Sequence, residues 1–186
     1  MDKPTLTGEL VVLRPLRADD AHGMFEMVTD PEGRRMTGTT AVFTTEQVEQ
    51  WCAEAGTRDG RIDWAVTIQG SQEYLGEIVL NDMDDHARSA NMRLGLRPGQ
   101  RGRGLAREAI ELVLAYAFAP TPEGLGLHRV GLDVLAFNAR ARALYDSLGF
   151  VTEGRLREAH RDGQYWADVY LMSVLEDDYR AHQGEA

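Results

Sequence analysis

The residues Gln100-Arg101-Gly102-Arg103-Gly104-Leu105-Ala106 form the most informative segment of this chain. An apolar run at residues 92–96 and a Pro98-Gly99 turn precede it, and apolar side chains recur at helical spacing from Leu105 to about Phe118. A strand, a glycine-rich turn and a helix N-terminus in this order make an anion site, because backbone N–H groups and the positive end of the helix dipole point into one concavity.

The glycine-rich turn favours a phosphate ligand in particular. Gly102 and Gly104 carry no Cβ, so a phosphate can approach the main chain closely, and Arg101 and Arg103 add positive charge. We interpret residues 101–106 as a pyrophosphate cradle. An ATP-binding P-loop is disfavoured, because the turn lacks the Lys-Ser/Thr pair that such a loop carries after its glycines.

Composition predicts one soluble domain spanning residues 1–186. Hydrophobic residues make up 43% and charged residues 27%, and no apolar run is long enough to span a bilayer. The single cysteine, Cys52, and the absence of an apolar leader after Met1 predict a cytoplasmic protein without disulfides. The net charge of −10 disfavours nucleic acid as a partner and is compatible with a cationic amine. We expect neither a membrane nor a nucleic-acid partner.

Hydrophobic periodicity predicts an α+β fold. Strands are expected at residues 10–13, 63–68, 74–80, 90–96, 128–134, 151–156 and 165–174. About four helices are expected, at residues 17–28, 44–56, 105–118 and 139–148, and Pro31 is expected to break the first segment. Short links between the middle strands indicate an antiparallel meander, and the strand–helix–strand unit around residues 90–134 indicates a parallel pair. The sheet should therefore be mixed and mostly antiparallel.

Residues 138–150 form the second informative segment, at a strand-to-helix junction. Ala141, Leu144, Tyr145 and Leu148 share one face of the predicted helix. Ala141 is small enough to let a ligand come close. Tyr145 is either a core aromatic or a phenol presented to that ligand.

The two segments together resemble the GNAT superfamily of acyl-CoA-dependent N-acetyltransferases. The pattern Arg101-x-x-Gly104-x-Ala106 is similar to the acetyl-CoA pyrophosphate motif, and Asn138 to Tyr145 with Leu148-Gly149-Phe150 is similar to the segment that follows it. Residues 8–16 and 161–168 look like the branch that includes ribosomal-protein N-terminal acetyltransferases. The resemblance spans nearly the whole chain and implies a sheet whose parallel strand pair is splayed.

The resemblance also implies roles for single residues. It places the following residues at acetyl-CoA: Leu94, Gly95 and Leu96 along the pantetheine arm, Arg101, Gly102, Arg103, Gly104, Leu105 and Ala106 at the pyrophosphate, and Asn138, Arg140 and Ala141 beside them. Tyr145 would protonate the leaving thiolate. Arg140 and Arg142 could approach the 3′-phosphate of CoA or could be solvated helix charges. No metal is implied.

The base that deprotonates the amine is left open between Asp133, Glu77 and a water relay. Asp133 lies within an apolar strand, where a carboxylate is costly unless it is paired, and Glu77 lies on another strand. Cys52 is expected in the core. The stretch 82–86, Asp-Met-Asp-Asp-His, reads as a polar turn rather than a metal site.

These patterns predict an enzyme that transfers an acetyl group from acetyl-CoA directly to the primary amine of a small molecule or peptide, in a ternary complex. A non-catalytic acyl-CoA-binding module is the alternative. His160 and Trp166 could line the amine pocket, or could be a surface histidine and a core tryptophan. A homodimer is expected from the resemblance alone.

Overall fold

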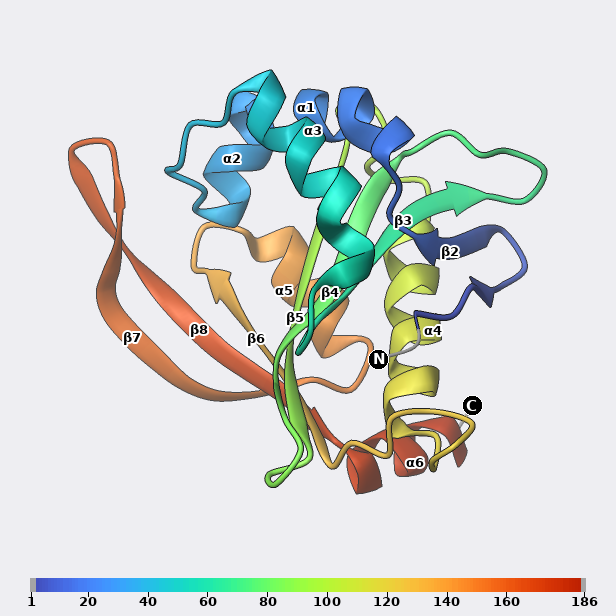
Figure 1. The fold of residues 1–186 in the computed structure, drawn as a ribbon. Coiled ribbons are helices and arrows are strands. Elements are labelled where there is room, and N and C mark those ends of the chain that lie inside the picture. Colours follow the sequence, from blue (N-terminus) through green and yellow to red (C-terminus); the bar gives the residue numbers. More distant parts are fainter. Residues whose placement is uncertain (1–2, 185–186) are drawn as a thin grey trace.

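The computed structural model describes residues 3–184, which form one eight-stranded sheet flanked by helices (Figure 1). The strand order is β1-β2-β3-β4-β5-β6-β8-β7, and every neighbouring pair except β5–β6 is antiparallel. The strands are β1 (Leu6–Thr7), β2 (Val11–Pro15), β3 (Ile62–Ile68), β4 (Gly76–Asp84), β5 (Ser89–Leu96), β6 (Arg129–Leu135), β7 (Val151–Asp162) and β8 (Tyr165–Leu175). The mixed, mostly antiparallel sheet confirms the predicted fold class.

Six α-helices lie within the described residues, where about four were predicted. They are α1 (Ala21–Thr29), α2 (Pro31–Thr37), α3 (Thr45–Glu54), α4 (Leu105–Phe118), α5 (Ala139–Asp146) and α6 (Glu176–Gly184). Two 3₁₀ turns, Ala18–Asp20 and Ala55–Thr57, extend α1 and α3. The capping box of Thr44 and Gln47 that the sequence indicated starts α3.

The expected break before Pro31 is confirmed, since α1 ends at Thr29, but a second helix that the sequence did not indicate, α2, begins at Pro31 itself. Asp30 is the N-cap of α2, and its carboxylate accepts a hydrogen bond of 2.8 Å from the backbone N–H of Gly33. Proline suits the first helical position, since its missing N–H would have no partner there. The segment after α1, to which the sequence analysis assigned no helix or strand, is therefore a short second helix.

The parallel pair is the feature of the sheet that opens a site. β5 and β6 pair at only three positions, Ser89–Arg129, Ala90–Val130 and Asn91–Gly131. Both strands continue beyond that point, β5 to Leu96 and β6 to Leu135, and α4 connects them. The two strands therefore separate into a wedge, as the resemblance implied.

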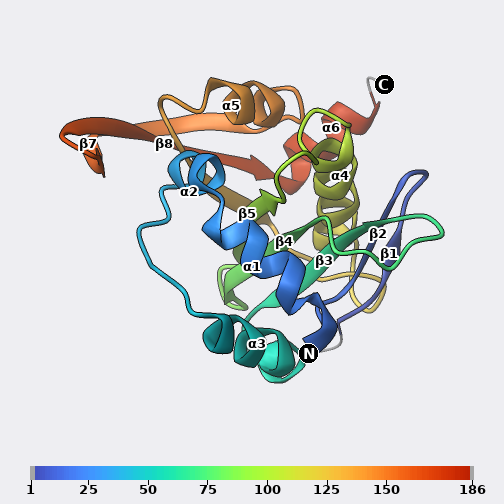
Figure 2. The ribbon, with the colours of Figure 1, turned by 90° about the horizontal axis from the view of Figure 1, so that it is seen from above.

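Helices cover both faces of the sheet (Figure 2). The apolar side of α4, including Ile110 and Val113, packs in the main core with Ile78 of β4. On the opposite face, Met27 of α1 and Cys52 of α3 form a smaller core with Ala65 of β3 and other residues. Because neighbouring residues of a strand point to opposite faces, alternate residues of β3, β4 and β5 serve two different environments.

The C-terminal part of the chain extends further than the sequence predicted. β8 lies where the sequence predicted it, whereas β7 runs to Asp162 rather than 156, and the two strands form a hairpin that projects from the body of the protein (Figure 1). Irregular pairing interrupts the hairpin between Leu156 and His160. Helix α6, which the sequence did not predict, packs Tyr179 against Phe118 of α4 with ring centroids 5.1 Å apart.

Candidate active site

The glycine-rich loop has the geometry of an anion cradle. Gly102 and Gly104 have φ angles of +80° and +83°, which L side chains rarely adopt. Gly104 is the N-cap residue of α4, so the free N–H groups of the first turn face the loop. A Cβ added at Gly102 would lie 3.1 Å from Nη2 of Arg140, which shows that this guanidinium lies over the loop. The residues present fit a diphosphate.

The other arginines near the cradle are engaged elsewhere. Arg101 donates to Asp30 at 2.5 Å and to Glu32 at 2.9 Å, and Arg103 donates to Gln100. The guanidinium of Arg142 lies 4.1 Å from the ring centroid of Tyr170. Of these arginine side chains, Arg140 is therefore the one that the structure places over the loop.

Helix α5 begins at the end of the wedge. The side chain of Asn138 caps it by accepting from the N–H of Ala141 at 3.2 Å, and it donates to the carbonyl of Met36 at 3.1 Å. The oxygen and the nitrogen of the Asn138 amide therefore both form hydrogen bonds within the protein. The small Ala141 is half-buried and packs against the main core.

Tyr145 lies on α5, on the α4 side of the sheet, half-buried against the main core. Its ring centroid is 5.6 Å from that of Phe150. Burial, followed by the charge of Asp133, raises the pKa of the Tyr145 phenol to about 12. The phenol therefore stays protonated at neutral pH and can act as an acid.

Glu77 lies on the opposite face of the sheet from Tyr145. It pairs with Ala65 of the smaller core and with Gly95 of β5. Its Oε2 atom is buried and has no hydrogen-bond partner among the described residues. Burial, followed by the charge of Asp63, raises the pKa of Glu77 to about 7. A carboxylate with this pKa can accept a proton near neutral pH.

Asp133 differs from Glu77 in its surroundings. Its side chain is exposed, so the burial expected from the apolar strand is absent. It lines a cavity of about 300 Å³ together with Asn91 and Gly131, the last residues of the parallel pairing, and with Asp82. This cavity therefore lies where the wedge begins.

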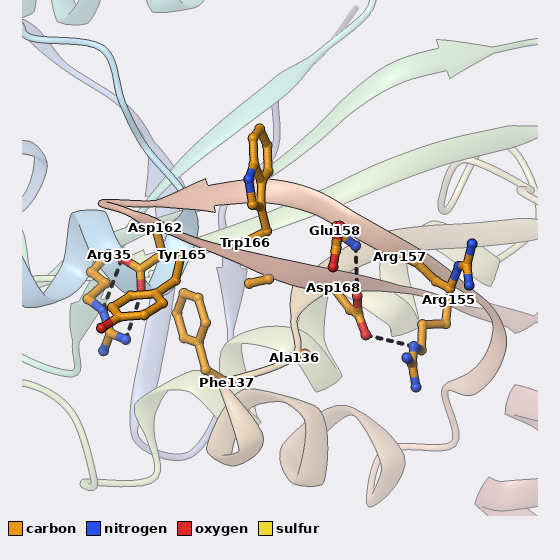
Figure 3. Close-up of a pocket in the computed structure, with 11 residues that line it drawn as sticks. Arg35, Ala136, Phe137, Arg155, Arg157, Glu158, Asp162, Tyr165, Trp166 and Asp168 are labelled. Carbon is orange, nitrogen blue, oxygen red and sulfur yellow. Dashed lines mark hydrogen bonds and ion pairs between the residues drawn. The ribbon is translucent and has the colours of Figure 1, made fainter.

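A larger cavity of about 850 Å³ lies under the projecting hairpin (Figure 3). Arg35 reaches from α2 to Asp162 at 2.8 Å, and its guanidinium lies 4.5 Å from the ring centroid of Phe137. Arg155 pairs with Asp168 at 2.7 Å. The cavity is lined by Arg35, Ala136, Phe137, Arg155, Arg157, Glu158, Asp162, Tyr165, Trp166, Ala167 and Asp168.

The sequence analysis identified few of the residues that line this larger cavity. Trp166 was a candidate lining residue, and it is 60% exposed on the hairpin rather than in the core. His160 is half-buried beside Gly38 and Phe137. Arg35 and Phe137 were missed because nothing in their local sequence indicates that residues so far apart meet.

Two other sequence expectations have clear outcomes. Cys52 is buried in the smaller core, as predicted. The stretch 82–86 forms the end of β4 and the turn before β5, where Asp84 accepts from the N–H of Ala87 at 2.8 Å. Within residues 3–184, no cluster of three or more His, Cys, Asp or Glu side chains could hold a metal, and no helix has the length and apolarity to cross a membrane.

Comparison with known proteins assigns the family. The family model described as "Acetyltransferase (GNAT) domain" matches residues 11–151. This chain belongs to the GNAT acetyltransferase family. It is therefore an acetyl-CoA-dependent N-acetyltransferase, and nothing in the comparisons supports the non-catalytic alternative.

Individual relatives of this acetyltransferase include enzymes with known amine substrates. An uncharacterised N-acetyltransferase p20 of Bacillus licheniformis is 26% identical over 94% of this chain and 98% of its own. A spermidine N(1)-acetyltransferase of Vibrio cholerae is 32% identical over 61% of this chain and 64% of its own. A crystal structure of the Vibrio cholerae spermidine N-acetyltransferase with CoA and spermine superposes with a TM-score of 0.83 and 25% identity, over 93% of this chain and 99% of that one.

Proposed function

We propose that acetyl-CoA binds with its diphosphate at residues 101–106 and its pantetheine arm along Leu94, Gly95 and Leu96. The observation that carries this proposal is the early end of the β5–β6 pairing beside the glycine-rich loop. A wedge between two strands leaves main-chain groups of β5 without a strand partner, and an extended ligand can take that place. Arg140 supplies the positive charge, while Arg101 and Arg103 contribute through their main chain.

The amine attacks the acetyl carbonyl directly, in a ternary complex with both substrates. Glu77 removes the amine proton, either directly or through one water, because a carboxylate with a pKa of about 7 can accept and release a proton near neutral pH. Tyr145 donates its phenolic proton to the thiolate of CoA as the C–S bond breaks. The two groups lie on opposite faces of the sheet, which suits proton removal and proton donation on opposite sides of one carbonyl.

Asp133 is better suited to binding the acceptor than to acting as the base. Its exposed carboxylate and that of Asp82 line the cavity at the start of the wedge. Arg129, which also lines this cavity, is paired with Glu153, so the carboxylates of Asp133 and Asp82 can attract a cationic ligand. The chain as a whole carries a net charge of −10. We propose a small cationic amine, of the spermidine type, as the acceptor.

A ribosomal-protein N-terminal amine is the second candidate acceptor. Residues 8–16 and 161–168 favour it, because they resemble the branch that contains such enzymes. A single domain spanning residues 1–186 is proposed in either case. A screen of thiol release from acetyl-CoA with polyamines and with short peptides would distinguish the two acceptors.

The Tyr145→Phe variant tests the catalytic site. We expect it to bind CoA as tightly as the wild type does, because only the hydroxyl is removed, and to lose about 10²-fold or more in kcat with the preferred amine. Isothermal calorimetry measures the first quantity and thiol release the second. An unchanged kcat would show that Tyr145 donates no proton.

A further inference from the structure

Helix α2 is attached to the rest of the protein by polar contacts. None of its seven residues is buried. A helix of this length is not stable by itself in water, so its position depends on what holds its ends and its exposed side chains. The views in Figures 1 and 2 place α2 beside the end of β6 and the start of α5.

The C-terminal half of α2 contacts the projecting hairpin and the start of α5. Arg35 pairs with Asp162 of the hairpin, and the carbonyl of Met36 accepts from the Asn138 side chain. Asn138 is also the cap of α5, the helix that carries Tyr145. A movement of α2 would therefore change both the hairpin cavity and the start of α5.

The N-terminal end of α2 contacts the glycine-rich loop. Arg101 Nη2 lies 2.5 Å from Asp30 Oδ2 and Arg101 Nη1 lies 2.9 Å from Glu32 Oε2. The same Oδ2 atom of Asp30 accepts the capping hydrogen bond from Gly33. One carboxylate thus starts α2 and holds the loop. Asp30 is the more enclosed partner, with a side chain 13% exposed against 67% for Glu32.

We infer that the Arg101–Asp30 pair is a positioning contact that couples occupancy of the diphosphate loop to the placement of α2. This inference rests on the proposed function, since it requires acetyl-CoA at the loop. A ligand that fixes residues 101–106 also fixes Arg101, which restrains Asp30 and the helix that Asp30 caps. Because α2 also contacts Asn138, the cap of the helix that carries Tyr145, occupancy of the loop should favour the arrangement of α5 in which the amine reacts. Acetyl-CoA and the amine should therefore bind cooperatively, within the range of about 5-fold to 150-fold that is usual for linked sites.

The Asp30→Asn variant isolates this contact. Asparagine is as good an N-cap as aspartate, so α2 keeps its capping hydrogen bond while the ion pair to Arg101 is lost. Glu26→Gln is the matched control, because Glu26 also pairs with an arginine, Arg97, at 2.6 Å, but Arg97 precedes the loop. Arg101→Lys keeps the charge without the two-pronged geometry and should lie between the wild type and Asp30→Asn.

The experiment is hydrogen–deuterium exchange over residues 31–37 with and without saturating CoA, in the full chain. We expect CoA to slow exchange in α2 at least about 5-fold in the wild type and in Glu26→Gln, and to slow it clearly less in Asp30→Asn, where only the contact of Arg101 with Glu32 still links the loop to α2. At saturating acetyl-CoA, Asp30→Asn should raise the KM of the amine more than it lowers kcat.

The outcomes separate this inference from the function on which it rests. Slowed exchange of α2 in a folded Asp30→Asn variant to the wild-type extent would overturn the coupling, and so would CoA binding that leaves α2 of the wild type unaffected. A wild-type protein that fails to bind CoA in calorimetry would overturn the proposed site itself, and the coupling with it.

Discussion

The Glu77→Gln variant should be more stable than the wild type at alkaline pH and less active. In the folded protein, burial raises the pKa of Glu77 from 4.5 to about 7. The neutral carboxyl is therefore favoured in the folded state, and stability from this group is complete below pH 4.5 and is lost as the pH rises through 7.

The size of the effect follows from the two pKa values. Each pH unit of difference is worth about 1.4 kcal/mol, so ionised Glu77 costs about 3 kcal/mol at pH 8 and less than about 1 kcal/mol at pH 5. These values are upper limits, because Glu77 is half-buried and water screens part of its charge. For a chain of this size, the gain in Tm should be roughly 5–10 °C larger at pH 8 than at pH 5.

Urea unfolding of the wild type and Glu77→Gln at pH 5 and pH 8 measures the stability gain at each pH. A packing change caused by the substitution is the same at both pH values, so it cancels when the two gains are compared. Glu73→Gln, which alters an exposed carboxylate paired with Arg97, is the control and should show no such gain.

The catalytic activity of Glu77→Gln should fall while its stability rises, with kcat/KM for the amine reduced about 10²-fold to 10⁴-fold. In the wild type, kcat/KM should decline below about pH 7, and Glu77→Gln should lack that decline. A Glu77→Gln variant with equal stability gains at both pH values would refute the assignment of a raised pKa, and retained activity would refute the role as base.

Three further changes test other parts of the structure. Gly104→Ala should weaken CoA binding about 10-fold in calorimetry, because a φ of +83° within the cradle costs an L residue roughly 1–2 kcal/mol. The control is Gly99→Ala, at φ +78° in the turn before the cradle, which should lower stability but change the CoA affinity little. Glu108→Gln should lower the free energy of unfolding by about 2 kcal/mol in urea titration, because the Glu108 carboxylate accepts hydrogen bonds from three successive backbone N–H groups before and within β2. The control is Glu111→Gln, which removes an i,i+4 ion pair with Arg107 and should change the free energy of unfolding by no more than about 0.5 kcal/mol. Cys52 should resist iodoacetamide in the native protein, because burial, followed by the charge of Asp20, raises its pKa to about 12; rapid alkylation at pH 8 would contradict its place in the core.

The homodimer expected from the resemblance stays a prediction. The hairpin exposes Tyr165 and Trp166, which are 69% and 60% accessible in the single chain. Sedimentation equilibrium would measure the oligomeric state directly.

Local sequence determined the elements that depend on neighbouring residues. The cradle, α4 and the helix that carries Tyr145 could be placed from glycine positions and apolar spacing, because both act over a few residues of chain. The capping box of α3 followed in the same way. At Pro31 the sequence indicated the end of one helix but not the start of the next, because a proline that ends one helix also suits the first turn of another.

The tertiary structure decided which polar and charged side chains are paired within the protein and which are free to bind a ligand. Arg101 and Asn138 looked alike as ligands in sequence, but one is paired with α2 and the other caps α5. Likewise, the strand position of Asp133 indicated burial, yet Asp133 is exposed and Glu77 is the carboxylate with a buried oxygen that has no partner among the described residues. Burial and pairing depend on residues brought together from distant parts of the chain, and no local pattern records them.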